Sequence, residues 1–249
     1  MVKKEVLLTH YQTEYQFINK LKGWCEQAKQ SLIVQTDFLD LRQIEILKAV
    51  FKKEGVTNYY QHPGMVNSFR STITINTPTP NLVVLVAKQN PSALLQHNEV
   101  LGYLLNELGL ELRVFGDLYV TAEIIALSCL AKVANVLTTH PLVINNQVVS
   151  FQPTTDQITI NHQFDEFSKN VKSLRLDAVV SAICHLSRDN AQTMIQKNNV
   201  FVNFSAVNTK TFLVSYDNII SIRKYGRFRI AAIIKNKNDN YRLTIAKFK

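Results

Sequence analysis

The chain has 249 residues, 46% of them hydrophobic, which is enough for one large domain or for two or three small ones with buried cores. No apolar run approaches the roughly 18 residues of a membrane-spanning helix, and the opening MVKKEVLLTHYQTEYQ lacks the apolar region of a signal peptide. The net charge of +9 is segregated, because residues 169–249 carry +11 and residues 1–168 carry −2. This asymmetry predicts a polyanion-binding module attached to a near-neutral body. The alternative is a solvated basic surface without a partner.

The first region, residues 1–77, is predicted to form a helix–helix–strand domain of α/β type. Its expected elements are helices at 14–30 and 40–55, followed by strands at 56–61 and 71–76. Asp40 and Gln43 have the spacing of a capping box at the start of the second helix. Gly55 is expected to end that helix.

The Thr-Pro repeat at 77–80 favours extended backbone and is expected to separate this region from a second one, residues 78–165. The predicted elements are a strand at 82–88, a helix at 98–109, two strands within 111–121 about a turn at Gly116-Asp117, a helix at 122–137, and a last strand at 148–153 or 157–160. This β-α-β-β-α-β order is that of the ferredoxin-like sandwich, which many RNA-recognition domains share with unrelated proteins. The aromatic strand motif that stacks bases in those domains is not visible, so only the fold points to RNA binding here.

Residues 161–170 are polar and are expected to be a linker before a third region, residues 170–249. Two short amphipathic helices are predicted at 174–185 and 187–198, the second capped by Ser187. The strands expected to follow lie at 200–204, 219–224, 228–235 and 241–247. The region as a whole is therefore predicted to be two short helices packed on a small sheet, and the fold class of the chain is α+β.

The start of the second of these helices is the best candidate for an anion-binding site. Arg188 would follow the Ser187 cap, where free N–H groups and the helix dipole favour a phosphate and a guanidinium adds a bidentate fork. Because the same dipole disfavours a cation, an arginine at this position indicates a ligand. The alternative is that Asp189 neutralises the charge of the arginine locally. Arg175 begins the preceding helix in the same way, so the two starts could form one anion-binding face. The residues expected to extend that face are Lys172, Lys197, Arg223, Lys224, Arg227 and Arg229.

Aromatic residues accompany these basic ones in SIRKYGRFRI, residues 221–230. Tyr225 and Phe228 flank Arg227, an arrangement that suits stacking on an unpaired base while arginines bind phosphate. The alternative is a hairpin with core aromatics and solvated cations. The helix before it stops at Asn198-Asn199, where we expect Asn199 to take the left-handed conformation that usually requires glycine.

Catalytic signatures are missing from the sequence. There is no G-x-G-x-x-G, Walker loop, H-E-x-x-H or G-x-S-x-G motif, and the six histidines are scattered singly. The odd, widely spaced Cys25, Cys129 and Cys184, each in a segment predicted to be helical, favour buried free thiols in a reducing cytoplasm over a disulfide framework or a zinc site. We therefore expect no cofactor, no metal and no enzymatic activity.

Residues 174–204, LRLDAVVSAICHLSRDNAQTMIQKNNVFVNF, resemble the S4-type RNA-binding domain, whose pattern is R-L-D, then S-R-x-x-A-x-x-x-I, a turn and V-x-V-N. The matching positions are Arg175, Leu176, Asp177, Ser187, Arg188, Ala191, Ile195, Val200, Val202 and Asn203. TDFLDLRQIEIL, HNEVLGYLLNELGLELRVFGD and KYGRFRI extend the resemblance to the YlmH-type proteins of bacteria, over nearly the whole chain. Departures from that family are Asn199 in place of glycine, Ser205 in place of a basic residue, and a single glycine, Gly64, in the stretch after the second helix.

The resemblance implies a cytoplasmic, non-catalytic protein that binds ribosomal RNA and tRNA on the large ribosomal subunit. It implies a role in quality control of stalled nascent chains. We expect the protein to be a monomer. Two alternatives remain open. One is an RNA-modification enzyme or accessory factor. Asp117 is its nearest catalytic candidate, although a structural role for Asp117 in a turn is the simpler interpretation. The other is a cell-division-linked interaction protein whose first two domains bind a protein partner.

Overall fold

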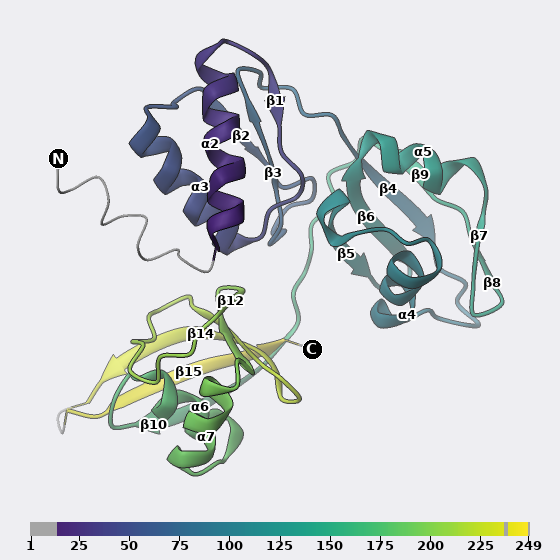
Figure 1. Ribbon diagram of the computed structural model, residues 1–249. Coiled ribbons are helices and arrows are strands. Elements are labelled where there is room, and N and C mark those ends of the chain that lie inside the picture. Colours follow the sequence, from purple (N-terminus) through teal and green to yellow (C-terminus); the bar gives the residue numbers. More distant parts are fainter. Residues whose placement is uncertain (1–13, 237–238, 249) are drawn as a thin grey trace. The chain divides into compact units, whose positions relative to one another are not determined.

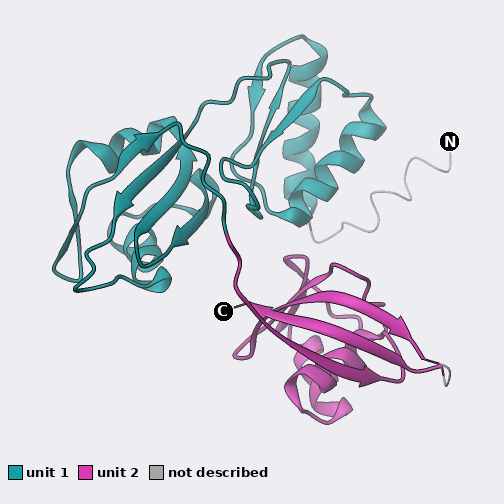
Figure 2. Ribbon diagram, turned by 180° about the vertical axis from the view of Figure 1, so that it is seen from behind, with its two compact units in different colours: residues 1–160 teal, residues 161–249 magenta. Residues whose placement is uncertain are grey.

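The computed structural model of the protein describes residues 14–236 and 239–248 (Figure 1). The chain divides into two compact units, residues 1–160 and 161–249 (Figure 2). The fold mixes helices and strands, as predicted, and its sheets are antiparallel. The absence of a signal peptide concerns a stretch of which residues 1–13 lie outside the described residues. Within the described residues, no helix has both the length and the apolar character needed to cross a membrane.

The first part of unit 1 packs two helices on a small sheet. Helices α2 (Tyr15–Lys29) and α3 (Leu41–Glu54) cover a three-stranded antiparallel sheet in the order β1-β3-β2, with strands Val34–Gln35, Thr72–Ile75 and Tyr59–His62. The capping box is confirmed: the Asp40 carboxylate accepts the Gln43 N–H at 2.8 Å, and the Gln43 side chain accepts the Asp40 N–H at 3.0 Å. Gly55 ends α3 with a φ of +75°, as expected.

The second part of unit 1 has a four-stranded antiparallel sheet in the order β5-β6-β4-β9. The strands are β4 (Leu82–Lys88), β5 (Phe115–Val120), β6 (Ile124–Leu130) and β9 (Gln152–Thr154). The helices are α4 (His97–Gly102), which continues as a π-helix over Tyr103–Glu107, and α5 (Ala131–Thr139). A 3₁₀ turn, Leu112–Val114, precedes β5. A small hairpin joins β7 (Leu142–Ile144) to β8 (Gln147–Val149). The predicted β-α-β-β-α-β order is therefore present, with the hairpin inserted before the last strand.

Two of the predicted elements in this part are wrong. The helix expected at 122–137 is strand β6 followed by the shorter helix α5, because a short, continuous apolar run such as IIALSCL fits a buried strand as well as a helix. Cys129 accordingly lies in a strand. The turn expected at Gly116-Asp117 is instead an irregularity within the single strand β5, whose pairing with β6 shifts register between Phe115 and Leu118.

Both faces of this sheet are covered. Alternate residues of β4 and β6, including Leu85 and Leu127, pack with the helices in one core. The opposite face, which includes Val84 and Ala126, is covered by Met65 and Ile160. Segments 63–68 and 157–160 therefore occupy the face that an RNA-recognition sheet leaves open for bases.

Unit 2 is built on a six-stranded antiparallel sheet in the order β10-β15-β14-β13-β11-β12. Its strands are β10 (Phe164–Val171), β11 (Val200–Val202), β12 (Ser205–Ala206), β13 (Ile219–Ile222), β14 (Gly226–Lys235) and β15 (Tyr241–Phe248). Helices α6 (Leu176–Cys184) and α7 (Arg188–Gln196) pack on one face of the sheet, as predicted. The linker expected at 161–170 is wrong, because most of it is the edge strand β10, whose largely exposed residues read as polar loop.

Candidate nucleic-acid interface

The two arginines singled out in the sequence meet on one buried carboxylate. The side chain of Asp177, in the first turn of α6, is fully buried. It accepts hydrogen bonds from Nε and Nη2 of Arg175 at 3.2 and 3.0 Å, and from Nη2 of Arg188 at 2.9 Å. The amide of Gln192, one turn after Arg188 on α7, donates to the same carboxylate at 3.0 Å. The two helix starts are thereby joined, because the guanidinium groups of both donate to one carboxylate.

The charges of this cluster leave it net positive. Burial alone would raise the pKa of Asp177, but hydrogen bonds and charge from Arg188 and Arg175 outweigh it, so the pKa lies below its ordinary value and the carboxyl is ionised. Asp177 uses two of the five donors of Arg175 and one of those of Arg188. The arginine side chains are 34% and 47% exposed. A buried anion thus orients two cations that still reach solvent, an arrangement that suits the binding of a phosphate.

The helix cap explains how the sequence places Arg188. Ser187 accepts the N–H of Asn190 at 3.2 Å, so Arg188 is the first helical residue, as predicted. Arg175 differs slightly, since it is the N-cap residue of α6 and not its first helical residue. The unfavourable position of a cation at a helix start is compensated by Asp177, and the sequence had suggested Asp189 for that role.

The end of α7 corrects one prediction. The left-handed residue is Asn198, with a φ of +53°, and Asn199 lies outside that region. The N–H of Asn199 donates to Met194 O at 3.0 Å and that of Asn198 to Ile195 O at 3.1 Å. These are the two hydrogen bonds of a Schellman motif. Asparagine tolerates the left-handed region better than most residues do, so the turn into β11 is preserved without glycine.

The structure places the remaining predicted basic residues at several points of unit 2. Lys197 is the C-cap of α7, at the opposite end of that nine-residue helix from Arg188. The N–H of Arg223 donates to Asn199 O, which brings the turn that carries Arg223 and Lys224 next to the end of α7. Lys172 is exposed between β10 and α6.

Arg227 and Arg229 lie on the other side of the sheet. Their neighbours in β14, Phe228 and Ile230, belong to the core beneath α6 and α7. Because successive residues of a strand alternate in direction, the two arginines point away from the helices. Arg229 contacts Asp217, with a distance of 2.5 Å between Nε and Oδ1.

The aromatic residues near Arg227 are not those that the sequence suggested. Phe228 is buried in the core and Tyr225 is 37% exposed in the turn. The guanidinium of Arg227 lies 5.2 Å from the ring centre of Phe204 and 5.8 Å from that of Phe248. These are cation–π distances. Both rings are distant from Arg227 in the sequence and could not be predicted as its neighbours, because only the pairing of strands in the sheet brings them close.

Two residues that contact the arginine site were not among those predicted from the sequence. Gln192 lies four residues after Arg188, a spacing that places both on one helix face, and this signal was available in the sequence. The position of Lys210 next to the site is visible only in the tertiary structure. Its Nζ lies 3.4 Å from Oε1 of Gln192, and its carbonyl accepts the N–H of Asp177 at 3.4 Å.

The alternative catalytic candidate, Asp117, has a structural role. One of its carboxylate oxygens accepts the backbone N–H groups of Phe69 at 2.6 Å and Arg70 at 3.0 Å. It thereby ties the two parts of unit 1 together at the irregularity in β5. Among residues 14–236 and 239–248, no three His, Cys, Asp or Glu side chains are placed to hold a metal ion.

The three thiols are free and buried, as predicted. Burial raises the pKa of Cys25 and Cys184 to about 11 and that of Cys129 to about 12. Thiols with such pKa values are protonated at neutral pH and are poor nucleophiles.

The fold and the arginine site define a class: a mixed α/β protein with a basic C-terminal unit in which two helix starts present paired arginines. No family model matches the chain. The chain is 27% identical over 248 residues to the Ribosome-associated protein quality control protein P2 of Bacillus subtilis (strain 168), a YlmH-type protein, and the match spans 95% of this chain and 96% of that one. The resemblance to the YlmH-type proteins is thus confirmed.

Among solved structures, the chain is similar to the Cell division protein YlmH from Streptococcus pneumoniae. The identity is 19%, the TM-score is 0.49, and the match covers 57% of this chain and 92% of that one. At this TM-score the structural likeness is slight.

Proposed function

We propose that the protein is a non-catalytic, cytoplasmic RNA-binding factor that associates with the large ribosomal subunit and acts in the quality control of stalled nascent chains. Unit 2 would be its S4-type RNA-binding domain, and the second part of unit 1 an RNA-recognition-like domain. The relative in Bacillus subtilis is named for ribosome-associated quality control, and that name carries no enzymatic activity.

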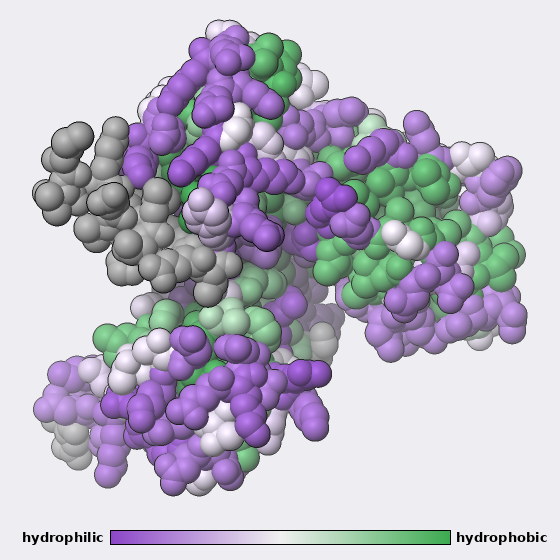
Figure 3. Space-filling view, in the orientation of Figure 1, coloured by the Kyte–Doolittle hydropathy of each residue, from purple (hydrophilic) through white to green (hydrophobic). Residues whose placement is uncertain are grey.

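The arginine pair is the observation that carries the proposal. Arg175 and Arg188 are bound to one buried anion at the starts of two helices, in a unit of high positive charge. The surface over these helices is mostly hydrophilic in the view of Figure 3. A phosphate of ribosomal RNA or tRNA would accept from the remaining donors of both guanidinium groups.

The covered sheet of unit 1 supports a proposal in which unit 2 makes the main RNA contact. In RNA-recognition domains, unpaired bases stack on the open face of the sheet. Here Met65 and Ile160 pack on that face. We therefore propose that any RNA contact of unit 1 uses its loops or helices and not its sheet.

The phosphate contact is tested by filter binding of an rRNA fragment across a salt series. Arg188→Ala should weaken binding on every RNA sequence and reduce the slope of log K against log salt by about one phosphate contact. Arg242→Ala is a matched control, because Arg242 is exposed on β15, where it alternates with the core residue Leu243 and faces away from the helices. Unchanged affinity and slope for Arg188→Ala would remove this residue from the proposal.

The ribosomal role is tested by sedimentation of the tagged protein in sucrose gradients, with and without stalled translation. Co-migration with free large subunits, increased by stalling, is the expected result. Migration only at the top of the gradient under both conditions would contradict it. Nucleotide analysis of RNA from a deletion strain addresses the modification-enzyme alternative, for which we expect no altered nucleotide.

A further inference from the structure

A loop of unit 2 runs directly beside the arginine pair. Residues 207–217 connect β12 to β13, and their backbone is fixed against the start of α6: the N–H of Leu176 donates to Phe212 O and that of Val214 to Leu174 O, both at 2.8 Å. Arg175 and Leu213 are partners in an antiparallel bridge. The loop is therefore a second wall of the site.

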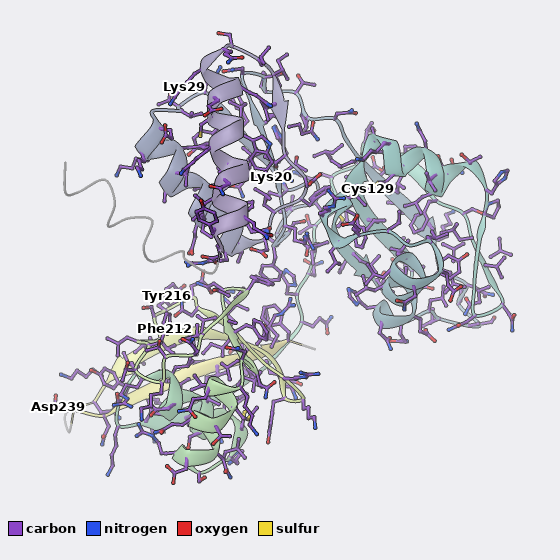
Figure 4. All side chains as sticks on the ribbon, in the orientation of Figure 1. Lys20, Lys29, Cys129, Phe212, Tyr216 and Asp239 are labelled. Carbon is purple, nitrogen blue, oxygen red and sulfur yellow. The ribbon has the colours of Figure 1, made fainter. Side chains whose placement is uncertain are left out.

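Some side chains of this wall face the core and others face solvent. Phe212 and Val214 pack against the core of unit 2, whereas Leu213 is 65% and Tyr216 is 63% exposed. Among the described residues of unit 2, these are the most exposed large hydrophobic side chains. Figure 4 labels Phe212 and Tyr216 on the upper edge of the unit, where Figure 3 shows hydrophobic atoms gathered.

Position and charge indicate what these side chains contact. Bridge partners in antiparallel strands project to the same side, so Leu213 lies next to Arg175. Lys210, on the same loop, adds a third cation through its contact with Gln192. Two exposed hydrophobic side chains lie on a loop that also carries Lys210 and bridges to Arg175, in a unit of net charge +9. This combination matches a nucleotide whose base is exposed, since such a ligand offers both a phosphate and a flat apolar ring.

We propose that the arginine pair and the loop 207–217 form one composite site for RNA with an unpaired nucleotide. Phosphate binds Arg175, Arg188 and Lys210, and the unpaired base packs on Leu213 and Tyr216. Fully paired RNA offers the phosphates alone, because its bases are stacked inside the helix. The inference rests on the proposed function of the same arginines.

The experiment compares the affinity of the full-length protein for two RNA hairpins that differ only in a single bulged nucleotide. The unsubstituted protein should prefer the bulged hairpin. The double variant Leu213→Ala, Tyr216→Ala should bind the bulged hairpin about tenfold more weakly and the paired hairpin about equally well. Tyr216→Phe should retain the preference, because the ring is kept. Ile234→Ala is the matched control, as it removes a similarly exposed hydrophobic side chain from β14.

The outcomes separate this inference from the proposed function. If Arg188→Ala weakens the binding of both hairpins but the double variant keeps the preference for the bulged hairpin, the composite site is wrong and the RNA-binding function stands. If Arg188→Ala weakens the binding of neither hairpin, both proposals fail. If the double variant binds both hairpins normally but no longer sediments with ribosomal particles, the loop contacts a protein, which also overturns the inference.

Discussion

Nη2 of Arg188 lies 2.9 Å from Oδ2 of Asp177, although eleven positions separate the two residues in the chain. The contact crosses from the start of α7 to the start of α6, and Arg175 and Gln192 converge on the same carboxylate. Asp177 thus sets the direction of both arginines. A fully buried carboxylate needs such partners, because burial of an unpaired charge is strongly unfavourable.

Asp177→Asn should therefore destabilise unit 2. The amide keeps the size of the side chain but loses the charge that balances the arginines, so we expect the free energy of unfolding at neutral pH to fall by about 1–3 kcal/mol. Urea denaturation followed by circular dichroism measures the change. Asp239→Asn is the control, since the Asp239 side chain is 86% exposed, and it should have little effect.

The contribution of Asp177 should also depend on pH. Its folded pKa lies below the ordinary value of 3.8, so its stabilisation is fully present above that value. It is lost as the pH falls through the lower, folded pKa. The stability difference between the unsubstituted protein and Asp177→Asn should hence be constant from pH 7 to 5 and shrink in strong acid. A difference that grew with acidification would contradict the ionised state of Asp177.

Ser187 is expected to stabilise α7 as its N-cap. Ser187→Ala removes the acceptor for the Asn190 N–H and should lower the free energy of unfolding by about 1 kcal/mol. Ser187→Asp supplies another good acceptor and should restore most of the loss. If both substitutions destabilise equally, the hydroxyl acts in some way other than capping.

The two asparagines at the end of α7 should respond differently to substitution. Asn198→Gly relieves a left-handed residue and should be neutral or stabilising by a few tenths of a kcal/mol, whereas Asn198→Ala should cost about 1 kcal/mol. Asn199→Gly only adds backbone freedom and should be slightly destabilising. Thermal unfolding of the three variants checks the assignment, and a gain confined to Asn199→Gly would refute it.

Gly116 is required by packing in unit 1. A Cβ there would lie 2.4 Å from Oγ of Ser128 and 2.7 Å from the Phe38 ring, both well inside contact distance. Gly116→Ala should thus destabilise unit 1 by about 1–3 kcal/mol. Gly23→Ala offers the opposite case: it lies inside α2 with open space around it, and alanine should stabilise the helix by about 0.5–1 kcal/mol. Differential scanning calorimetry of both variants tests the pair.

Local signals in the sequence predicted much of the fold. The capping box of Asp40 and Gln43, the cap at Ser187 and the strands of residues 200–247 depend on neighbours within a few positions, so pattern alone locates them. Prediction failed where local patterns are ambiguous. The apolar run of β6 suits a strand or a helix, and the exposed edge strand β10 has the polarity of a linker.

The sequence by itself determined that the positive charge lies in the last third of the chain and that Arg175 and Arg188 stand at two helix starts, because charge and capping are properties of the local chain. Only the tertiary structure decided that these arginines share one buried carboxylate, that Arg227 and Arg229 face away from them, and that Leu213 lies beside Arg175. Those relationships depend on the packing of α6 against α7 and on the register of the sheet, which bring together residues that are distant in sequence.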